Sequence, residues 1–120
     1  MKSRGGVGDA GGVSVAGFAT ASDVVPPGGA FEASFALRVE GDAPRKLRVE
    51  YAIDYAKANG ARSRKLFKLS EREYAPGETT LSFRRSFRDM TTRKHYPGEH
   101  GAAVVVNGSE LASLTFRFGL

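Results

Sequence analysis

Cationic side chains crowd a short stretch of the sequence that follows an aromatic residue and turns at Asn59. The stretch contains Lys57, Arg62, Arg64 and Lys65, and apolar residues resume directly after it. Lysine and arginine neutralise phosphate groups, so this stretch could hold the backbone of a nucleic acid. Asn59 is its only amide side chain and therefore the one candidate for reading a base edge. The competing interpretation is a solvated connection between two strands.

A second group of cations follows later in the chain, close to Pro97-Gly98. If successive strands run antiparallel, alternate connections lie at the same end of the fold, so residues 57–64 and 88–99 share one end. We expect the net charge of +5 to concentrate there, because the opposite connections carry Asp42, Glu73 and Glu78. The predicted nucleic-acid-binding residues are Lys57, Asn59, Arg62, Arg64, Lys65, Arg88, Arg93 and Lys94.

Two histidines and a glutamate offer a different chemistry, metal binding, near the same turn. His95 and His100 flank Pro97-Gly98, with Glu99 beside them. A zinc site needs further converging ligands, and this spacing matches no helical zinc motif, so we predict no metal and no cofactor. A turn into a strand is the simpler interpretation, with Tyr96 as the corner tyrosine of an immunoglobulin-like sandwich. No nucleophile motif accompanies the histidines, so we predict that the chain is not an enzyme.

Two formal motif matches have simpler structural explanations. Residues 6–11 match G-x-G-x-x-G, but that fingerprint binds a dinucleotide only between a strand and a helix, and neither flank is indicated. Residues 107–109 match a glycosylation sequon, yet Asn-Gly is also the strongest short signal for a two-residue hairpin turn. We therefore predict a flexible lead-in over residues 1–12 and a hairpin turn at Asn107-Gly108.

From Val13 onward the sequence has a hydrophobic period of two, which indicates the strands that must position these side chains. Apolar residues alternate with polar ones over most of the chain, which is typical of half-buried strands. Proline, glycine and asparagine mark the breaks. Seven strands are predicted, at 13–20, 31–40, 47–56, 65–72, 78–87, 100–107 and 109–118. This pattern predicts an all-β fold, an immunoglobulin/fibronectin-like antiparallel β-sandwich over residues 13–120, with a small barrel as the alternative.

The inward positions of these strands define the expected core. The strand predicted over residues 78–87 does not fit this pattern. Alternation that buries Phe83 and Phe87 also points Arg85 inward, where an unpaired charge is costly. We expect either a bulge near Arg84 or a strand that has left the core by Arg85. The predicted core residues are Phe31, Phe35, Leu37, Leu47, Val49, Tyr51, Ile53, Phe67, Leu69, Leu81, Phe83, Val104, Val106, Leu114 and Phe116.

Composition narrows the cellular setting of the chain. The 120 residues include no cysteine, which favours a reducing compartment. No apolar run approaches the roughly 20 residues that span a bilayer, and no apolar signal core follows the first residues. We therefore expect a cytoplasmic protein with no membrane partner.

Three segments, "AKANGARSRKLFKL", "YAPGETTLSF" and "TTRKHYPGEHGAAVVVNGSEL", resemble the C-terminal immunoglobulin-like domain of bacterial DNA alkylation repair proteins, the HEAT-like repeat DNA glycosylase family. The most specific pieces are residues 57–60, residues 65–69, and residues 91–93 leading into 96–100. In that family the helical repeats carry the recognition of alkylated bases and the glycosylase chemistry, and no such repeats are present in this sequence.

The resemblance implies a noncatalytic accessory module of a DNA alkylation repair protein. Its expected partners are DNA, through phosphate contacts, and a HEAT-like helical repeat domain against which it packs. The alternative from another class is a protein-interaction sandwich that binds a partner chain by an exposed sheet edge and has no nucleic-acid role.

Overall fold

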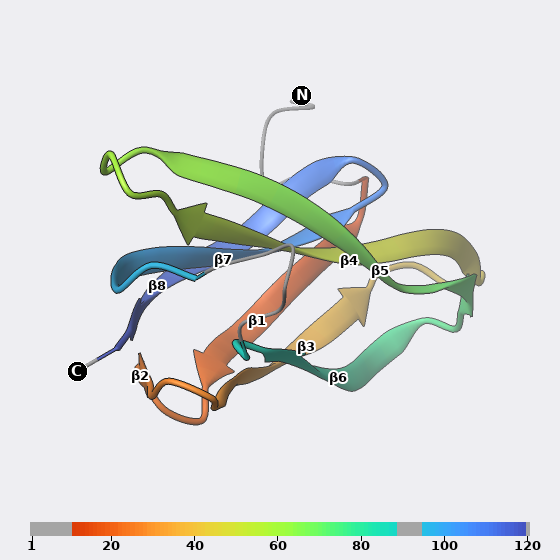
Figure 1. The fold of residues 1–120 in the computed structure, drawn as a ribbon. Helices are drawn as coiled ribbons and strands as arrows, with labels where there is room; N and C mark the ends of the chain where they lie inside the picture. The colour runs from red at the N-terminus through yellow and green to blue at the C-terminus, as the bar shows by residue number, and fades with distance from the viewer. Residues whose placement is uncertain (1–10, 89–94, 120) are drawn as a thin grey trace.

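Eight strands in two sheets make up the structure, a computed structural model that describes residues 11–88 and 95–119 (Figure 1). No helix is found among the described residues, and so none that is long and apolar enough to cross a membrane. The all-β immunoglobulin-like sandwich predicted from the sequence is confirmed. The strands are β1 (Val13–Thr20), β2 (Val24–Val25), β3 (Ala30–Val39), β4 (Arg45–Ala56), β5 (Arg62–Tyr74), β6 (Gly77–Ser86), β7 (Gly98–Val106) and β8 (Ser109–Phe118).

The two sheets contain three and five strands. The smaller has the order β1-β3-β6 and the larger the order β2-β8-β7-β4-β5, so β5 and β6 are edge strands on the same side of the sandwich. All pairings are antiparallel except that of β2 with β8. The two-residue β2 was not predicted, because it is too short to show alternation and is followed at once by two prolines.

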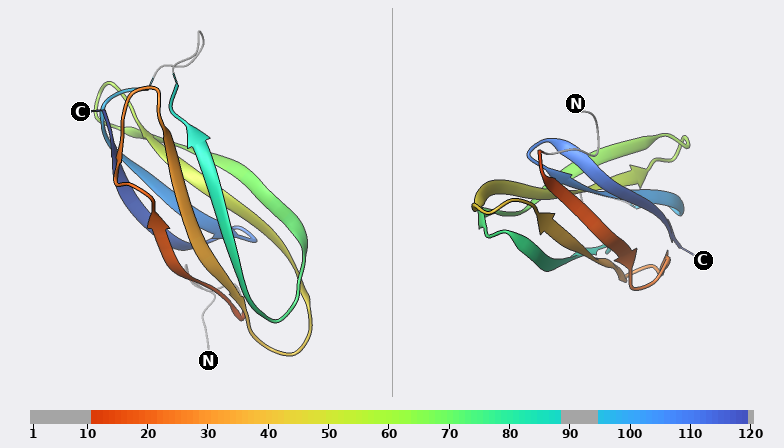
Figure 2. Two further views of the ribbon diagram at one scale, coloured as in Figure 1. Left: turned by 90° about the horizontal axis from the view of Figure 1, so that it is seen from below. Right: turned by 180° about the vertical axis from the view of Figure 1, so that it is seen from behind.

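The connections gather at opposite ends of the sandwich (Figure 2, left). Residues 21–29 and the turn 57–61 lie at one end, called here the 57–61 end, together with the start of β7 at Gly98. Residues 40–44, 75–76 and 107–108 lie toward the other end, where Gly12 also accepts a hydrogen bond from the Glu40 amide (2.8 Å). Alternate connections therefore share an end, as the antiparallel order predicts. The lead-in predicted over residues 1–12 lies almost wholly outside the described residues.

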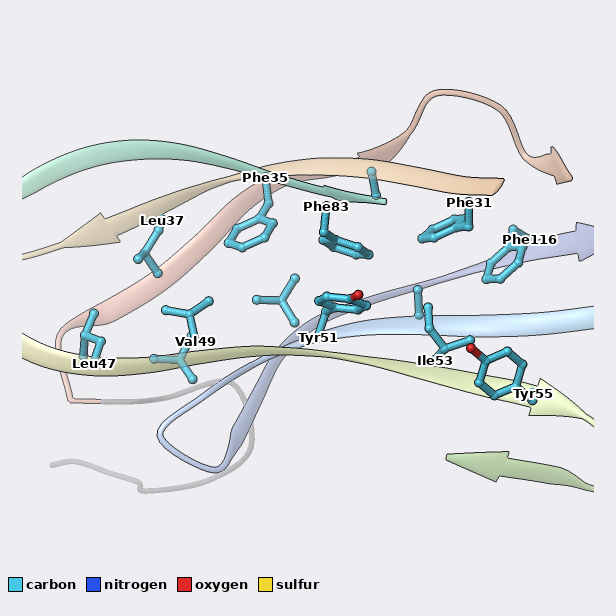
Figure 3. Close-up of a cluster of buried hydrophobic side chains, with 14 of the residues drawn as sticks. Phe31, Phe35, Leu37, Leu47, Val49, Tyr51, Ile53, Tyr55, Phe83 and Phe116 are labelled. Atoms are coloured by element: carbon cyan, nitrogen blue, oxygen red, sulfur yellow. The ribbon is translucent and has the colours of Figure 1, made fainter. Parts of the chain in front are cut away.

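The core lies between the sheets and is dominated by aromatic rings (Figure 3). Tyr51 and Phe83 face each other from opposite sheets, with ring centroids 3.9 Å apart and an interplanar angle of 10°. Four predicted core residues are only partly buried, namely Phe67, Leu69, Leu81 and Leu114, and three of them lie on the edge strands β5 and β6. Large side chains that the prediction left out but that are fully buried include Val25, Tyr74, Phe87 and His100.

Arg85 fits neither expectation formed from the sequence. β6 pairs with β3 without a register shift from Gly77 to Ser86, so the strand neither bulges nor leaves the core. The Arg85 guanidinium instead lies over the Phe67 ring, 3.7 Å from its centroid, and its Nη2 donates to the Tyr51 hydroxyl (2.8 Å). An arginine at the open side between two edge strands keeps access to water while its stem covers apolar surface, so its charge is never buried alone.

Candidate nucleic-acid interface

The turn 57–61 is held by its own backbone and by Asn59. The Lys57 amide donates to the Ala61 carbonyl (2.8 Å), and the Gly60 amide donates to the Lys57 carbonyl (3.0 Å). Asn59 Oδ1 accepts from the Ala61 amide (3.0 Å), and Gly60 adopts a φ of 86°. Asn59 was predicted as a base reader, but its carbonyl oxygen is occupied in shaping the turn.

Arg62 and Arg64 lie on β5 rather than in a loop, and both face the outside of the larger sheet. Arg64 forms a bidentate pair with Asp54 (2.7 and 3.1 Å) and reaches Glu110 on β8 with its Nη1 (2.9 Å). Arg62 pairs with Glu99 (2.8 Å). The hydrogen bond from Arg64 holds the pKa of Asp54 below its usual value, and the same pair raises the pKa of Arg64. Both arginines are therefore already neutralised by carboxylates.

Small residues form the floor beneath this charged network. Ala52 and Ala103 are completely buried although they point outward, because Arg64 must cross β4 and β7 to reach Glu110. Gly101 lies in the same floor, and a Cβ at Gly101 would sit 3.0 Å from Asp54 Oδ2 and 3.1 Å from Arg62 Nη1. The charged network therefore covers part of the outer face of the larger sheet.

Lys57 and Lys65 lie on the other side of the β4–β5 hairpin. They border a cavity of about 210 Å³ at the 57–61 end, between the hairpin and residues 95–96. Within residues 11–88 and 95–119 neither lysine forms an ion pair. The cavity is lined by Tyr55, Ala56, Lys57, Ser63, Lys65, His95 and Tyr96.

His100 fixes one wall of the cavity. Its Nδ1 accepts from the Ala56 amide (3.1 Å), so Nε2 carries the proton and donates to the Tyr96 carbonyl (2.9 Å). The ring is fully buried, and among its neighbours Phe116 stacks on it at 5.6 Å. Burial lowers the pKa of His100, which keeps the imidazole neutral.

The bonds of His100 bear on two expectations from the sequence. Both of its ring nitrogens are engaged, and Glu99 pairs with Arg62 rather than turning toward the histidines. No cluster of three or more metal-ligating side chains occurs among the described residues. Tyr96 is 37% exposed, and among the described residues its carbonyl rather than its hydroxyl forms a hydrogen bond, so the structure gives no support to the corner role expected of it.

The remaining predicted residues are separate from the cavity or outside the described ranges. Arg88 is exposed, and its amide donates to Ser86 Oγ (3.2 Å). Arg93 and Lys94 fall outside the described residues. Positive charge is less concentrated at the 57–61 end than the sequence predicted, because four further cations lie toward the opposite end: Arg38, Arg45, Lys46 and Arg72.

Sequence reasoning missed the aromatic part of the site. It treated Tyr55 as one more member of an alternating strand and Tyr96 as a corner residue, and it linked neither ring to the lysines. The usable signal was Lys65, which occupies an inward position of β5 opposite Ile53, where an apolar side chain is expected. A lysine at an inward position indicates that the sandwich opens to solvent there.

Comparison with known proteins places this geometry in a family. A family model described as "Uncharacterised protein YhaZ, C-terminal Ig-like domain" matches residues 14–119. The protein YhaZ of Bacillus subtilis (strain 168) is 44% identical over 84 residues, which are 69% of this chain and 24% of YhaZ. These matches confirm the resemblance found in the sequence.

Solved structures give the same assignment. The alkylpurine DNA glycosylase AlkC of Pseudomonas fluorescens, bound to DNA containing an abasic site analog, is 38% identical with a TM-score of 0.86, over 91% of this chain and 31% of AlkC. A mutant (D270A) β-glucosidase from Listeria innocua has a TM-score of 0.68 at 12% identity over 90% of this chain and 16% of its own, which shows a shared fold alone. The chain therefore spans about a quarter of YhaZ and just under a third of AlkC.

Proposed function

The chain belongs to the family of YhaZ C-terminal Ig-like domains, and we propose that it is a noncatalytic accessory domain of a DNA alkylation repair protein. In this role the domain contacts the phosphate backbone of DNA at its 57–61 end. The contact assists a DNA-binding partner domain and reads no sequence. A role on DNA also fits the cytoplasmic location expected from the sequence.

The observation that carries this proposal is the pair of lysines without counterions. Lys57 and Lys65 border one cavity at an open end of the sandwich, and neither is paired with a carboxylate of the described residues. Arg62 and Arg64, by contrast, are held by Glu99, Asp54 and Glu110. A phosphate approaching the lysines displaces no existing ion pair, whereas one approaching the arginines must compete with carboxylates.

The relatives indicate what kind of partner domain this chain would assist. AlkC, which shares the fold at 38% identity, is a DNA glycosylase in complex with DNA, and this chain covers only 31% of it. In the family that the sequence resembles, helical repeats carry the glycosylase chemistry. A domain of this kind raises the local concentration of DNA near such a partner, because two tethered sites bind more tightly than either alone.

Binding of duplex DNA by paired variants tests the proposal. The double variant Lys57→Ala, Lys65→Ala removes the two lysines that border the cavity. The double variant Lys46→Ala, Lys68→Ala makes the same charge change at the opposite end and on the outer face. Affinity for a random-sequence duplex at low salt should fall several-fold in the first variant and change little in the second. Thermal unfolding confirms that both variants fold.

Two outcomes would contradict the proposal. If both variants bound DNA with equal affinity, any loss relative to wild type would come from the lower net charge and not from the position of Lys57 and Lys65. No binding by any form, even at low salt, would favour the alternative of a protein-interaction sandwich.

A further inference from the structure

The cavity at the 57–61 end contains more than a phosphate contact requires. Lysines reach a duplex backbone from any exposed surface, and no hollow or aromatic lining is needed for that. Here Tyr55, Tyr96 and His95 line the same cavity as Lys57 and Lys65. Aromatic faces next to cations are the combination by which proteins hold unpaired nucleotides, with bases stacked on rings and phosphates on the positive charges.

We propose that this cavity receives one unpaired nucleotide of DNA, with its base against Tyr96 and its phosphate between Lys57 and Lys65. The inference rests on the proposed function and names the form of DNA that the same site prefers. It requires no recognition of a particular base, because every base offers a flat face to an aromatic ring.

The size and rigidity of the cavity fit a single ring system. Its volume of about 210 Å³ is below the roughly 300–1,000 Å³ of sites for drug-sized ligands. Tyr55 is only 9% exposed, and its ring packs 5.5 Å from both Phe87 and His95, so the cavity wall is already in place. The hydrogen bond from His100 to the Tyr96 carbonyl holds the backbone of the opposite wall.

The accessible partner for a base is Tyr96. The residue is 37% exposed while it lines the cavity, so its ring can be covered by an incoming base. Lys57 approaches from the turn and Lys65 from an inward position on β5, with Ser63 two residues before it. The two ammonium groups therefore come from different elements and can flank one phosphate.

Gapped DNA separates this inference from the proposed function. The intact chain is titrated with a duplex and with the same duplex carrying a short single-stranded gap, at one salt concentration, for wild type, Tyr96→Ala, Tyr96→Phe and Leu66→Ala. Leu66 is the matched control, because it is 53% exposed on the outer face of the same hairpin. A fluorescent adenine analogue in the gap reports stacking directly.

The wild type should bind gapped DNA about tenfold more tightly than intact duplex. Tyr96→Ala should lose this preference while keeping its affinity for intact duplex, and Tyr96→Phe and Leu66→Ala should retain the preference. The analogue should change its fluorescence with wild type and Tyr96→Phe but not with Tyr96→Ala.

Equal affinity of the wild type for the two DNAs, or a preference unchanged in Tyr96→Ala, would overturn the inference. Either result leaves the proposed function standing if duplex binding still depends on Lys57 and Lys65. Loss of that dependence would overturn the proposed function itself.

Discussion

His100 lies on β7, and its neutral ring forms hydrogen bonds to Ala56 at the end of β4 and to Tyr96. Protonation at Nδ1 would remove the acceptor for the Ala56 amide and place a charge among Phe87, Phe116 and Phe118. Burial lowers the pKa of His100 in the folded state, whereas the unfolded chain has the ordinary value of 6.5. The unfolded state therefore binds the proton first as the pH falls.

We expect the free energy of unfolding to be fully maintained above about pH 6.5 and to decrease as the pH falls from there through the lower folded pKa. Urea denaturation across this range measures the slope. Asp54 contributes in a separate and more acidic window, because its pKa lies below 3.8 in the folded state.

A glutamine variant tests the assignment to His100. His100→Gln removes the titration and should flatten the dependence on pH. A slope that is unchanged in His100→Gln would show that another group is responsible.

Phe35 tests the core at the level of one side chain. It is 2% exposed and packs edge-on against Phe18, with ring centroids 6.2 Å apart. Phe35→Ala should cost about 3–5 kcal/mol of unfolding free energy, because the transfer term and the cavity term add. Leu66→Ala, at an exposed position, should stay within about 0.5 kcal/mol of wild type. A denaturation midpoint that hardly moves in Phe35→Ala would be inconsistent with this core.

At the scale of the elements, the turn between β7 and β8 depends on Asn107. Asn107 has a φ of 49°, Gly108 has a φ of 85°, and Val106 pairs with Ser109, which makes the two-residue hairpin expected from the sequence. Asn107 Oδ1 also accepts from the Arg48 amide (2.9 Å), which ties the turn to β4.

Asn107→Ala should destabilise the protein by roughly 1–2 kcal/mol, since alanine tolerates a positive φ poorly and leaves the Arg48 amide without its partner. Asn59→Ala is the natural comparison. Asn59 also shapes a turn, but its φ is not positive, so its replacement should cost less. Chemical denaturation of both variants gives the difference, and an equal loss in the two would argue against a strained turn at Asn107.

The sequence predicted most strands because their inner faces are apolar, and it failed where that condition fails. β5 begins at Arg62 rather than residue 65, since Ser63 and Lys65 face inward next to the open cavity and show no apolar alternation. The cavity at the 57–61 end was missed for the same reason, because the side chains that line it on β5 are not apolar. Spacing placed the cations at one end, but which of them meet carboxylates depends on the register of β4 with β5 and on β7 and β8 lying beyond β4 in the same sheet.

At the scale of the whole molecule, the chain corresponds to only a part of the relatives it matches. It spans 24% of YhaZ and 31% of AlkC. We therefore predict that it releases no methylated bases from alkylated DNA by itself, with base release as the assay. Turnover by the pure chain that a point substitution within it abolishes would contradict the assignment as an accessory domain.

The salt dependence of duplex binding tests the central claim that Lys57 and Lys65, rather than the paired Arg62 and Arg64, contact phosphate. The logarithm of the association constant is measured against the logarithm of salt concentration for three proteins: wild type, Lys57→Ala with Lys65→Ala, and Arg62→Ala with Arg64→Ala. Each phosphate contact contributes about 0.9 to this slope on duplex DNA. The account predicts a slope shallower by up to about 1.8 in the lysine variant and a smaller change in the arginine variant. A slope that falls in the arginine variant and stays at the wild-type value in the lysine variant would contradict it.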